Sequence, residues 1–225
     1  SPDLPASLRL RFPLLLKFLD ADRNLSVQVH PDDTMGATLN PPDLGKTEAW
    51  YVLHADPGAK VYAGLKPNVT LETFAAAVDR GTTETLLHAF EAKAGDCIFV
   101  QAGTIHAIGA GLLIAEIQQA SNTTFRVFDW NRVDDQGNSR PLHIDQALAA
   151  THFERGPVNP TQRLPTDNPN WETVVRCNQF TMRHGRPQKS WTTGGDGKFR
   201  ILAAIGGSFE IQNDPADMPL SLGDT

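Results

Sequence analysis

The sequence predicts a mostly β protein, built as a jelly-roll β-barrel with a small helical insertion and followed by a second, incomplete β unit of the same type. Two observations lead to this prediction. Many short segments alternate apolar and polar residues between turn residues, as the strands of barrels and sandwiches do. One region, 70–88, shows helical spacing instead. With 225 residues, the chain can bury a sizeable core in one large or two small domains.

Most of the expected strands lie in the first two thirds of the chain. The first is an apolar run interrupted only by Lys17, and most of the others alternate in polarity. In chain order we expect strands at 14–19, 25–30, 49–54, 61–65, 97–101, 112–118 and 124–130.

Helices are expected in two places. In 70–88, Thr70 is a residue type that caps helix N-termini, and the spacing breaks at Gly81, so two short helices are predicted there. A third short helix is predicted at 144–150, after a turn-rich stretch at 131–141.

The segment 156–170 contains four prolines and is predicted to be an extended linker. It divides the chain into a first domain at 1–155, with the helical insertion at about 70–90, and a second, truncated β unit at 171–225. In the second unit we expect strands at 172–177, 179–183, 199–205 and 208–212.

A weak internal echo supports the second unit. The strand 48–53 with its later Gly95-Asp96 turn resembles 199–204 with Gly223-Asp224, although the helical insertion occurs only in the first copy. Both ends of the chain look cut, because no initiator Met is present and the last residues suggest a strand entering a turn. We therefore expect a fragment of a longer protein.

Composition narrows the class of partner. A net charge of −6 and a pI of about 5.6 argue against non-specific nucleic-acid binding, but a few local cations could still bind an anionic small molecule. The only cysteines, Cys97 and Cys177, suggest neither a disulfide framework nor a cysteine zinc site, which fits a reducing cytoplasm. No apolar run reaches the roughly 18 residues of a membrane helix. We predict a cytoplasmic monomer or weak homo-oligomer without membrane or nucleic-acid partners.

Four side chains in one β-rich region suggest a metal site. Gln28 and His30 lie two apart on an alternating strand and so share a face. Glu48 and His106 follow downstream. Two imidazoles, one carboxylate and one amide oxygen suit a zinc-class divalent ion with a position left for water or substrate.

These residues also belong to a longer signature. Gly95-x5-Gln101-x-Gly103-x2-His106 is similar to the second cupin motif, with Gln101 where a proline is usual. Five segments, in the family's order, resemble type I mannose-6-phosphate isomerase, in particular its short bacterial form; they are 12–17, 25–33, 45–51, 102–109 and 116–129. The resemblance implies cupin units, one bound zinc ion, a place in carbohydrate metabolism and the interconversion of mannose 6-phosphate with fructose 6-phosphate.

The resemblance implies that Gln28, His30, Glu48 and His106 are the zinc ligands. Two neutral imidazoles and one carboxylate leave the ion with net positive charge, which makes it a Lewis acid. A glutamine ligand adds no charge and preserves that character. The second β unit has no histidine after His184, so no metal is expected in it.

The implied reaction moves a proton between C1 and C2 of an open-chain sugar through an enediol, so it needs a proton carrier. Alternation from Ile114 points Glu116 inward, where burial would raise its pKa and make it a candidate general base. Lys46, two residues before Glu48, is the rival carrier. The resemblance marks Arg126 as the active-site arginine, in contact with substrate oxygens; the alternative is an ion pair with Asp129 or another carboxylate.

Two further residues are candidates for substrate binding. Lys17 is a candidate for the phosphate or for orienting Glu116, and Ser26 shares the face of Gln28 and could hydrogen-bond substrate. Lys46, Lys17 and Ser26 could each instead be purely supportive. One departure from the family pattern is Asn122, where an Asp is common, because an amide cannot act as a base.

Two other functions stay open at this stage. A non-catalytic cupin could hold a metal and bind sugar phosphate as a sensor, a reading that Asn122 supports. An iron-dependent oxygenase would also use two histidines and one carboxylate. The remaining histidines are expected to lie at the surface or in the core; they are His54, His88, His143, His152 and His184.

Overall fold

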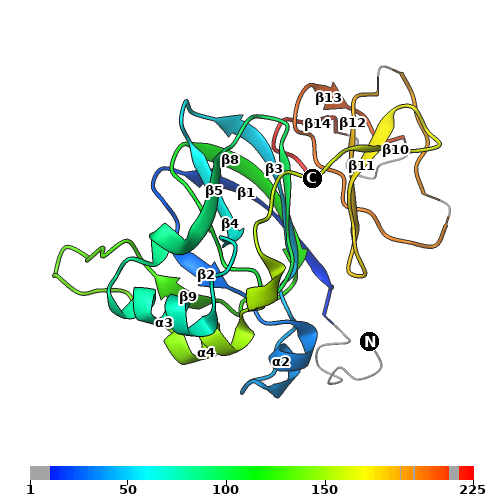
Figure 1. Cartoon of the computed structure of the whole chain (residues 1–225). Helices are drawn as coiled ribbons and strands as arrows, with labels where there is room; N and C mark the ends of the chain where they lie inside the picture. The colour runs from blue at the N-terminus through cyan, green and yellow to red at the C-terminus, as the bar shows by residue number, and fades with distance from the viewer. Residues whose placement is uncertain (1–10, 188, 195, 213–217) are drawn as a thin grey trace.

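In the computed structural model, which describes residues 11–187, 189–194, 196–212 and 218–225, strands predominate (Figure 1). The strands are β1 (Leu14–Ala21), β2 (Val27–Val29), β3 (Glu48–Ala55), β4 (Lys60–Leu65), β5 (Leu87–Glu91), β6 (Cys97–Val100), β7 (His106–Ile108), β8 (Leu112–Gln119), β9 (Phe125–Phe128), β10 (Leu164–Pro165), β11 (Trp171–Arg176), β12 (Thr181–Gly185), β13 (Ser208–Phe209) and β14 (Leu220–Ser221). The helices are α2 (Asp33–Thr38), α3 (Leu71–Asp79), α4 (Ile144–Ala150) and the 3-10 turns η1 (Thr83–Leu86) and η2 (Phe153–Arg155). The prediction of a mostly β protein is confirmed.

Two antiparallel sheets form the centre of the molecule. One has the order β1-β8-β3-β6 and the other the order β5-β4-β7-β2-β9. Their facing sides share one apolar core, in which Trp50 and Ile114 of the first sheet pack with Val61 and Ile108 of the second. Side chains alternate along a strand, and here the opposite sides of both sheets also carry apolar residues, which other elements cover.

Each outer face has its own cover. Helices α3 and α4 pack on the five-stranded sheet, with Phe74 and Ala147 buried against residues such as Val127. The hairpin β11–β12 packs on the four-stranded sheet, where Val174 and Phe180 join its outward residues in a third cluster. Figure 1 shows α3 and α4 on one side of the molecule and the C-terminal hairpins on the other.

Several boundaries differ from the sequence predictions. The helical prediction fails at the end of 70–88, because η1 replaces the second helix and Leu87 begins strand β5. The predicted strand at 199–205 is wrong, since those residues form no strand, and the strand predicted at 208–212 is the shorter β13, at 208–209. Strand β7 and helix α2 were not predicted. The helix predicted at 144–150 is confirmed as α4.

The predicted linker is extended for most of its length but is not detached from the rest of the chain. The amide of Thr161 donates to the carbonyl of Cys97 (2.7 Å), and Arg163 donates to the carbonyl of Gly95 (2.8 Å). Strand β10, inside the predicted linker, pairs with β11. The division of the chain into two domains at 156–170 stays a prediction.

Candidate metal and substrate site

Alternation along the strands sends the polar candidates into the space between the two sheets. In β2, Val27 and Val29 pack outward against the helices, so Gln28 between them faces inward. In β3, Ala49 and Tyr51 pack under the C-terminal hairpin, so Glu48 faces inward beside Trp50.

The strand register then brings residues from distant parts of the sequence together. Gln28 pairs with His106 on one neighbouring strand and with Arg126 on the other. In the facing sheet, Lys17 pairs with Glu116. These pairings bring five of the predicted site residues together across neighbouring strands.

His30, Glu48 and His106 form a buried cluster that could hold a metal ion. One ligand atom from each lies within 4.8 Å of the others. Nε2 of His106 lies 3.3 Å from Oε1 of Glu48, and Nε2 of His30 lies 3.6 Å from Oε2. Each of the three residues is 1% exposed. Among the described residues this is the one such group of three or more His, Cys, Asp or Glu side chains.

Backbone carbonyls orient both imidazoles. Nδ1 of His30 lies 3.0 Å from the carbonyl oxygen of Thr123, and Nδ1 of His106 lies 2.9 Å from that of Thr104. A carbonyl can only accept a hydrogen bond, so each Nδ1 must carry the proton. Each Nε2 is then left with a lone pair that points into the cluster, as a metal ligand requires.

The charges of the cluster also suit a cation. Burial lowers the pKa of His30 well below its usual value and lowers that of His106, although Glu48 opposes both shifts, so the imidazoles are neutral at pH 7. Burial opposes ionisation of Glu48, but the Lys46 ammonium, through its charge and its hydrogen bond, outweighs burial and the pKa of Glu48 is lowered to about 2. The cluster therefore offers two neutral nitrogens and one carboxylate.

The spacing of these groups would allow one metal ion to contact all three. Gln28 adjoins the cluster, because its Nε2 lies 3.3 Å from Nε2 of His106. Turning the amide by half a rotation exchanges its nitrogen with its oxygen, so the same side chain can present an oxygen there.

A lysine and a carboxylate adjoin the cluster. The Lys46 ammonium is paired with Glu48, lies 3.0 Å from Nε2 of His30, and is 3.9 Å from Oε1 of Glu116. Lys17 lies 2.9 Å from the same oxygen of Glu116. Burial and the charge of Glu48 raise the pKa of Glu116, while the two lysines oppose the rise.

These groups open onto a cavity of about 250 Å³ between the sheets. Lys17, Gln28, Lys46, Glu48 and Glu116 line it. Further lining residues come from β8 and the loop after it; they are Gln118, Ser121, Asn122 and Thr124. The predicted inward orientation of Glu116 is thus confirmed, and Asn122 adjoins the same cavity.

Arg126 and Ser26 stand beside the cavity without lining it. Nε of Arg126 donates to Oγ of Ser26 (3.2 Å), and Nη1 donates to the carbonyl of Pro141 (2.8 Å). Ser26 in turn donates to Gln28. The alternative pairing of Arg126 with Asp129 is wrong, because the partners of that carboxylate are Arg132 and Arg140.

Sequence reasoning missed several residues that support the site. Gln118 lies on the inward face of β8, and its Oε1 is buried without a hydrogen-bond partner. Alternation from Glu116 would have indicated it. The sequence predicts only a surface or core position for His143. In the structure its Nδ1 accepts a hydrogen bond from the backbone amide of Arg126 (3.2 Å).

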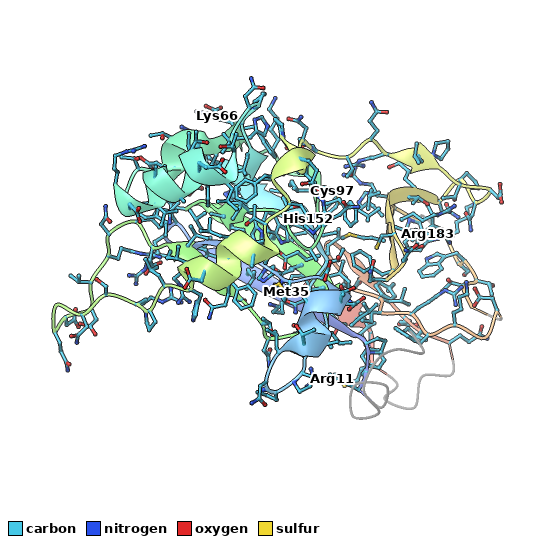
Figure 2. The ribbon with its side chains drawn as sticks, turned by 60° about the horizontal axis from the view of Figure 1, so that its bottom comes forward. Arg11, Met35, Lys66, Cys97, His152 and Arg183 are labelled. Atoms are coloured by element: carbon cyan, nitrogen blue, oxygen red, sulfur yellow. The ribbon has the colours of Figure 1, made fainter. Side chains whose placement is uncertain are left out.

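His152 supports the turn that precedes His106. It follows α4, as Figure 2 shows. A Cβ at Gly103, which has φ +86°, would lie 2.0 Å from Cδ2 of His152. The short Ala-Gly-Thr turn before β7 therefore depends on glycine for both its backbone conformation and its packing.

We expect Gly103→Ala to destabilise the protein by roughly 2 kcal/mol or more and to weaken metal binding, because it combines positive-φ strain with a clash against the His152 side chain. The free energy of urea unfolding checks the first effect. Gly58→Ala is the matched control, since Gly58 also has positive φ but its Cβ would meet nothing within 4 Å. Equal losses in the two variants would show that backbone strain alone is responsible.

Comparisons with known proteins agree with this geometry. Residues 4–47 match the catalytic domain of phosphomannose isomerase type I. A mannose-6-phosphate isomerase of Streptococcus mutans is 48% identical over 137 residues, which are 61% of this chain and 43% of that protein. ManA, a mannose-6-phosphate isomerase of Bacillus subtilis, is 33% identical over 215 residues, which are 95% of this chain and 68% of that protein. This chain belongs to the mannose-6-phosphate isomerase family.

The family's fold is shared as well as its sequence. The crystal structure of mannose 6-phosphate isomerase from Bacillus subtilis superposes with a TM-score of 0.85 at 30% identity, covering 95% of this chain and 68% of that one. The predicted cupin architecture is thereby confirmed. The chain matches less than half the length of its Streptococcus mutans relative. In the described ranges, no helix is long and apolar enough to span a membrane.

Proposed function

We propose that this chain carries the active site of a zinc-dependent aldose–ketose isomerase that interconverts mannose 6-phosphate and fructose 6-phosphate. One observation supports the proposal above all. A buried His-Glu-His cluster and a lysine-flanked carboxylate, Glu116, lie at the same cavity. A cation site next to a proton carrier is what moving a proton beside a sugar carbonyl requires.

In this proposal Gln28, His30, Glu48 and His106 hold the zinc ion. The bound ion would supply Lewis-acid stabilisation of negative charge on a substrate oxygen. Both histidines are pre-oriented by backbone carbonyls, so little conformational entropy remains to be lost when the ion binds.

Glu116 takes the role of general base, which removes the proton at C2 of the aldose and returns it at C1 of the resulting enediol. A second proton passes from the C2 hydroxyl to O1, so that C2 becomes the ketone and C1 carries the hydroxyl. Its carboxylate is buried, lines the cavity and accepts no well-directed hydrogen bond at Oε1. Lys46 is placed to assist. A cation held by Glu48 would repel the ammonium, and Glu116 offers it an alternative acceptor within 3.9 Å.

Arg126, Ser26 and Lys17 form the substrate-binding part of the proposal. Arg126 is proposed as the catalytic arginine that contacts substrate oxygens from beside the cavity, where its anchors at Ser26 and Pro141 fix the guanidinium. Lys17 is 35% exposed, so it can orient Glu116 and still meet an anionic group that enters from solvent. The partner is thus a small sugar phosphate; a monomeric or weakly oligomeric state and a cytoplasmic location stay predictions.

Chelation tests the proposal. We expect the purified protein to exchange the C2 proton of mannose 6-phosphate with solvent and to form fructose 6-phosphate in a coupled assay. Both activities should disappear when the metal is chelated and return with zinc. Full activity after chelation would contradict the metal role. Saturable sugar-phosphate binding without product would favour the sensor, and iron content with oxygen consumption would favour an oxygenase.

A further inference from the structure

Two loops meet beside the metal cluster, and Asp43 lies where they meet. One loop runs from α2 to Lys46 and Glu48 of the site. The other joins β8 to β9 and includes 121–124. The Asp43 side chain is only 15% exposed, and both of its oxygens are used.

The carboxylate accepts five hydrogen bonds. Oδ2 accepts three from the second loop: from Oγ of Ser121 (3.0 Å), the amide of Asn122 (3.1 Å) and Oγ1 of Thr123 (2.9 Å). Oδ1 accepts two others, from the amide of Leu44 (2.9 Å) and from Nη1 of Arg11 (2.8 Å). Asp43 is therefore a clamp that joins the two loops.

The loop that Asp43 holds makes the contact that orients His30. The Thr123 carbonyl accepts the Nδ1 proton of His30 at 3.0 Å, which leaves Nε2 free to bind metal. The same residue donates its hydroxyl to Asp43. Thr123 thus links Asp43 to the imidazole of His30: its hydroxyl binds the carboxylate, and its carbonyl binds the ring.

We propose that Asp43 is a positioning residue for the metal site, acting through the Thr123 carbonyl on the orientation and tautomer of His30. The proposal rests on the zinc site of the proposed function. Charge-assisted hydrogen bonds to a carboxylate are roughly twice as strong as neutral ones, so three of them hold the loop firmly. Without them the carbonyl is no longer fixed, and the His30 ring can rotate or place its proton on Nε2.

Two further observations support a role for the carboxylate charge itself. Burial raises the pKa of Asp43, but hydrogen bonds from Leu44, Asn122, Thr123 and Ser121 outweigh it and hold the pKa below its usual value. The Arg11 side chain, beside β1 in Figure 2, is 44% exposed, so solvent screens its ion pair with Asp43. The main role of the Asp43 carboxylate is therefore to hold the two loops.

Asp43→Asn tests the proposal. An amide cannot accept at both positions, because one of its ends must present N–H groups to N–H or O–H donors. We expect zinc affinity of the metal-free protein, measured by competition with a chromophoric chelator, to fall by about 10–100-fold. The matched control is Asp134→Asn. Asp134 also accepts backbone amides, from Gln136 (2.9 Å) and Asn138 (2.8 Å), but in an exposed turn apart from the cluster. The zinc affinity of Asp134→Asn should equal that of the wild type.

The tautomer of His30 provides a readout that loss of stability alone would not change. In ¹⁵N spectra of the metal-free wild type, we expect neutral His30 to carry its proton on Nδ1. In Asp43→Asn we expect a mixture with the Nε2-protonated form, while His106, held by Thr104, keeps its signal. If Asp43→Asn lowers stability but leaves the zinc affinity and the His30 signals unchanged, the clamp is merely structural and the proposal is wrong.

A milder variant covers the case in which Asp43→Asn does not fold. Thr123→Val keeps the carbonyl and removes only the hydroxyl that binds Asp43. We expect a smaller loss of zinc affinity in the same direction, and no change would overturn the proposal. If the wild-type chain binds no zinc, the proposed function fails, but the His30 spectra still decide the role of Asp43.

Discussion

Replacing Glu116 with glutamine is expected to lower kcat for mannose 6-phosphate isomerisation by about 10²–10⁴-fold, the usual contribution of a positioned general base. The amide keeps the size and most of the polarity of the side chain but cannot take a proton. Substrate binding should change less, so we expect KM to stay within a few-fold of the wild type. Zinc content should be unaffected, since Glu116 is not among the proposed ligands.

The reason to expect so large an effect is the environment of Glu116. It is 3% exposed and lines the cavity next to the metal cluster. Burial, and then the charge of Glu48, raise its pKa toward the neutral range in which a general base is most effective. Lys46 and Lys17 limit the rise of this pKa.

The measurement is the coupled assay together with exchange of the C2 proton, in which Arg126→Ala is also expected to be impaired. Glu91→Gln, at an exposed position on β5, is the matched control and should behave as the wild type. Lys17→Met adds a test of sign. Because Lys17 lowers the pKa of Glu116, its removal should move the acidic limb of the kcat pH profile to higher pH. An unaltered profile would separate Lys17 from the base.

Lys46 is the rival proton carrier, and the same assay distinguishes the two. If Glu116→Gln retained full activity while zinc-loaded Lys46→Met lost it, the base would be Lys46. If both variants and Arg126→Ala matched the wild type, none of these residues would take part in the chemistry.

The inward side chains of the site could be predicted because strand alternation is a local property. Gln28, Glu48 and Glu116 each lie on a strand whose outward neighbours are apolar and pack under a helix or hairpin. The apolar residues beside each of these side chains in the sequence therefore indicate which face of the sheet the side chain is on. Alternation also accounts for Gln118, which the sequence interpretation overlooked.

The supporting loops could not be predicted in this way, because their contacts join residues far apart in the sequence. Asp43 and Thr123 are 80 residues apart, and their meeting depends on how the strands are ordered, which alternation does not specify. Asp32 and Asp33 are a second case. In the structure Asp32 caps α2, while Asp33 accepts from the amide of Gly45 (2.9 Å), on the loop that leads to the site.

The failed strand at 199–205 has a different cause. Its apolar residues Ile201 and Ile205 pack against the cluster under β11–β12, but no neighbouring strand pairs with their backbone in the described residues. The hydrophobic pattern predicts which side chains are buried. It does not predict whether a neighbouring strand is present to pair with the backbone amides and carbonyls, which a strand also needs.

In the metal-free protein, Glu48→Gln is expected to lower the free energy of unfolding by about 3 kcal/mol, at the low end of the cost of breaking a buried ion pair. The variant leaves the Lys46 ammonium, 7% exposed, without the carboxylate that contacts it. Glu116 at 3.9 Å gives partial compensation, which is why the lower figure applies.

Lys46→Met is expected to cost less than Glu48→Gln, because the carboxylate it leaves behind has other partners. Nε2 of His106 and Nε2 of His30 lie 3.3 and 3.6 Å from the oxygens of Glu48, and either imidazole can take up a proton and pair with it. Loss of the ammonium raises the pKa of that histidine. The resulting stabilisation is present at low pH and is lost as pH rises, so this variant should be closer to the wild type at pH 6 than at pH 8.

The double variant Glu48→Gln/Lys46→Met separates pairing from packing. Removing both charges leaves no buried ion without a partner, so we expect the double variant to be more stable than Glu48→Gln alone. Urea unfolding in the presence of chelator, followed by tryptophan fluorescence, gives the three free energies needed for the cycle. If the two single losses simply add, Lys46 and Glu48 do not interact in the metal-free protein. The ammonium could then not be the group that holds this carboxylate ionised before a cation binds.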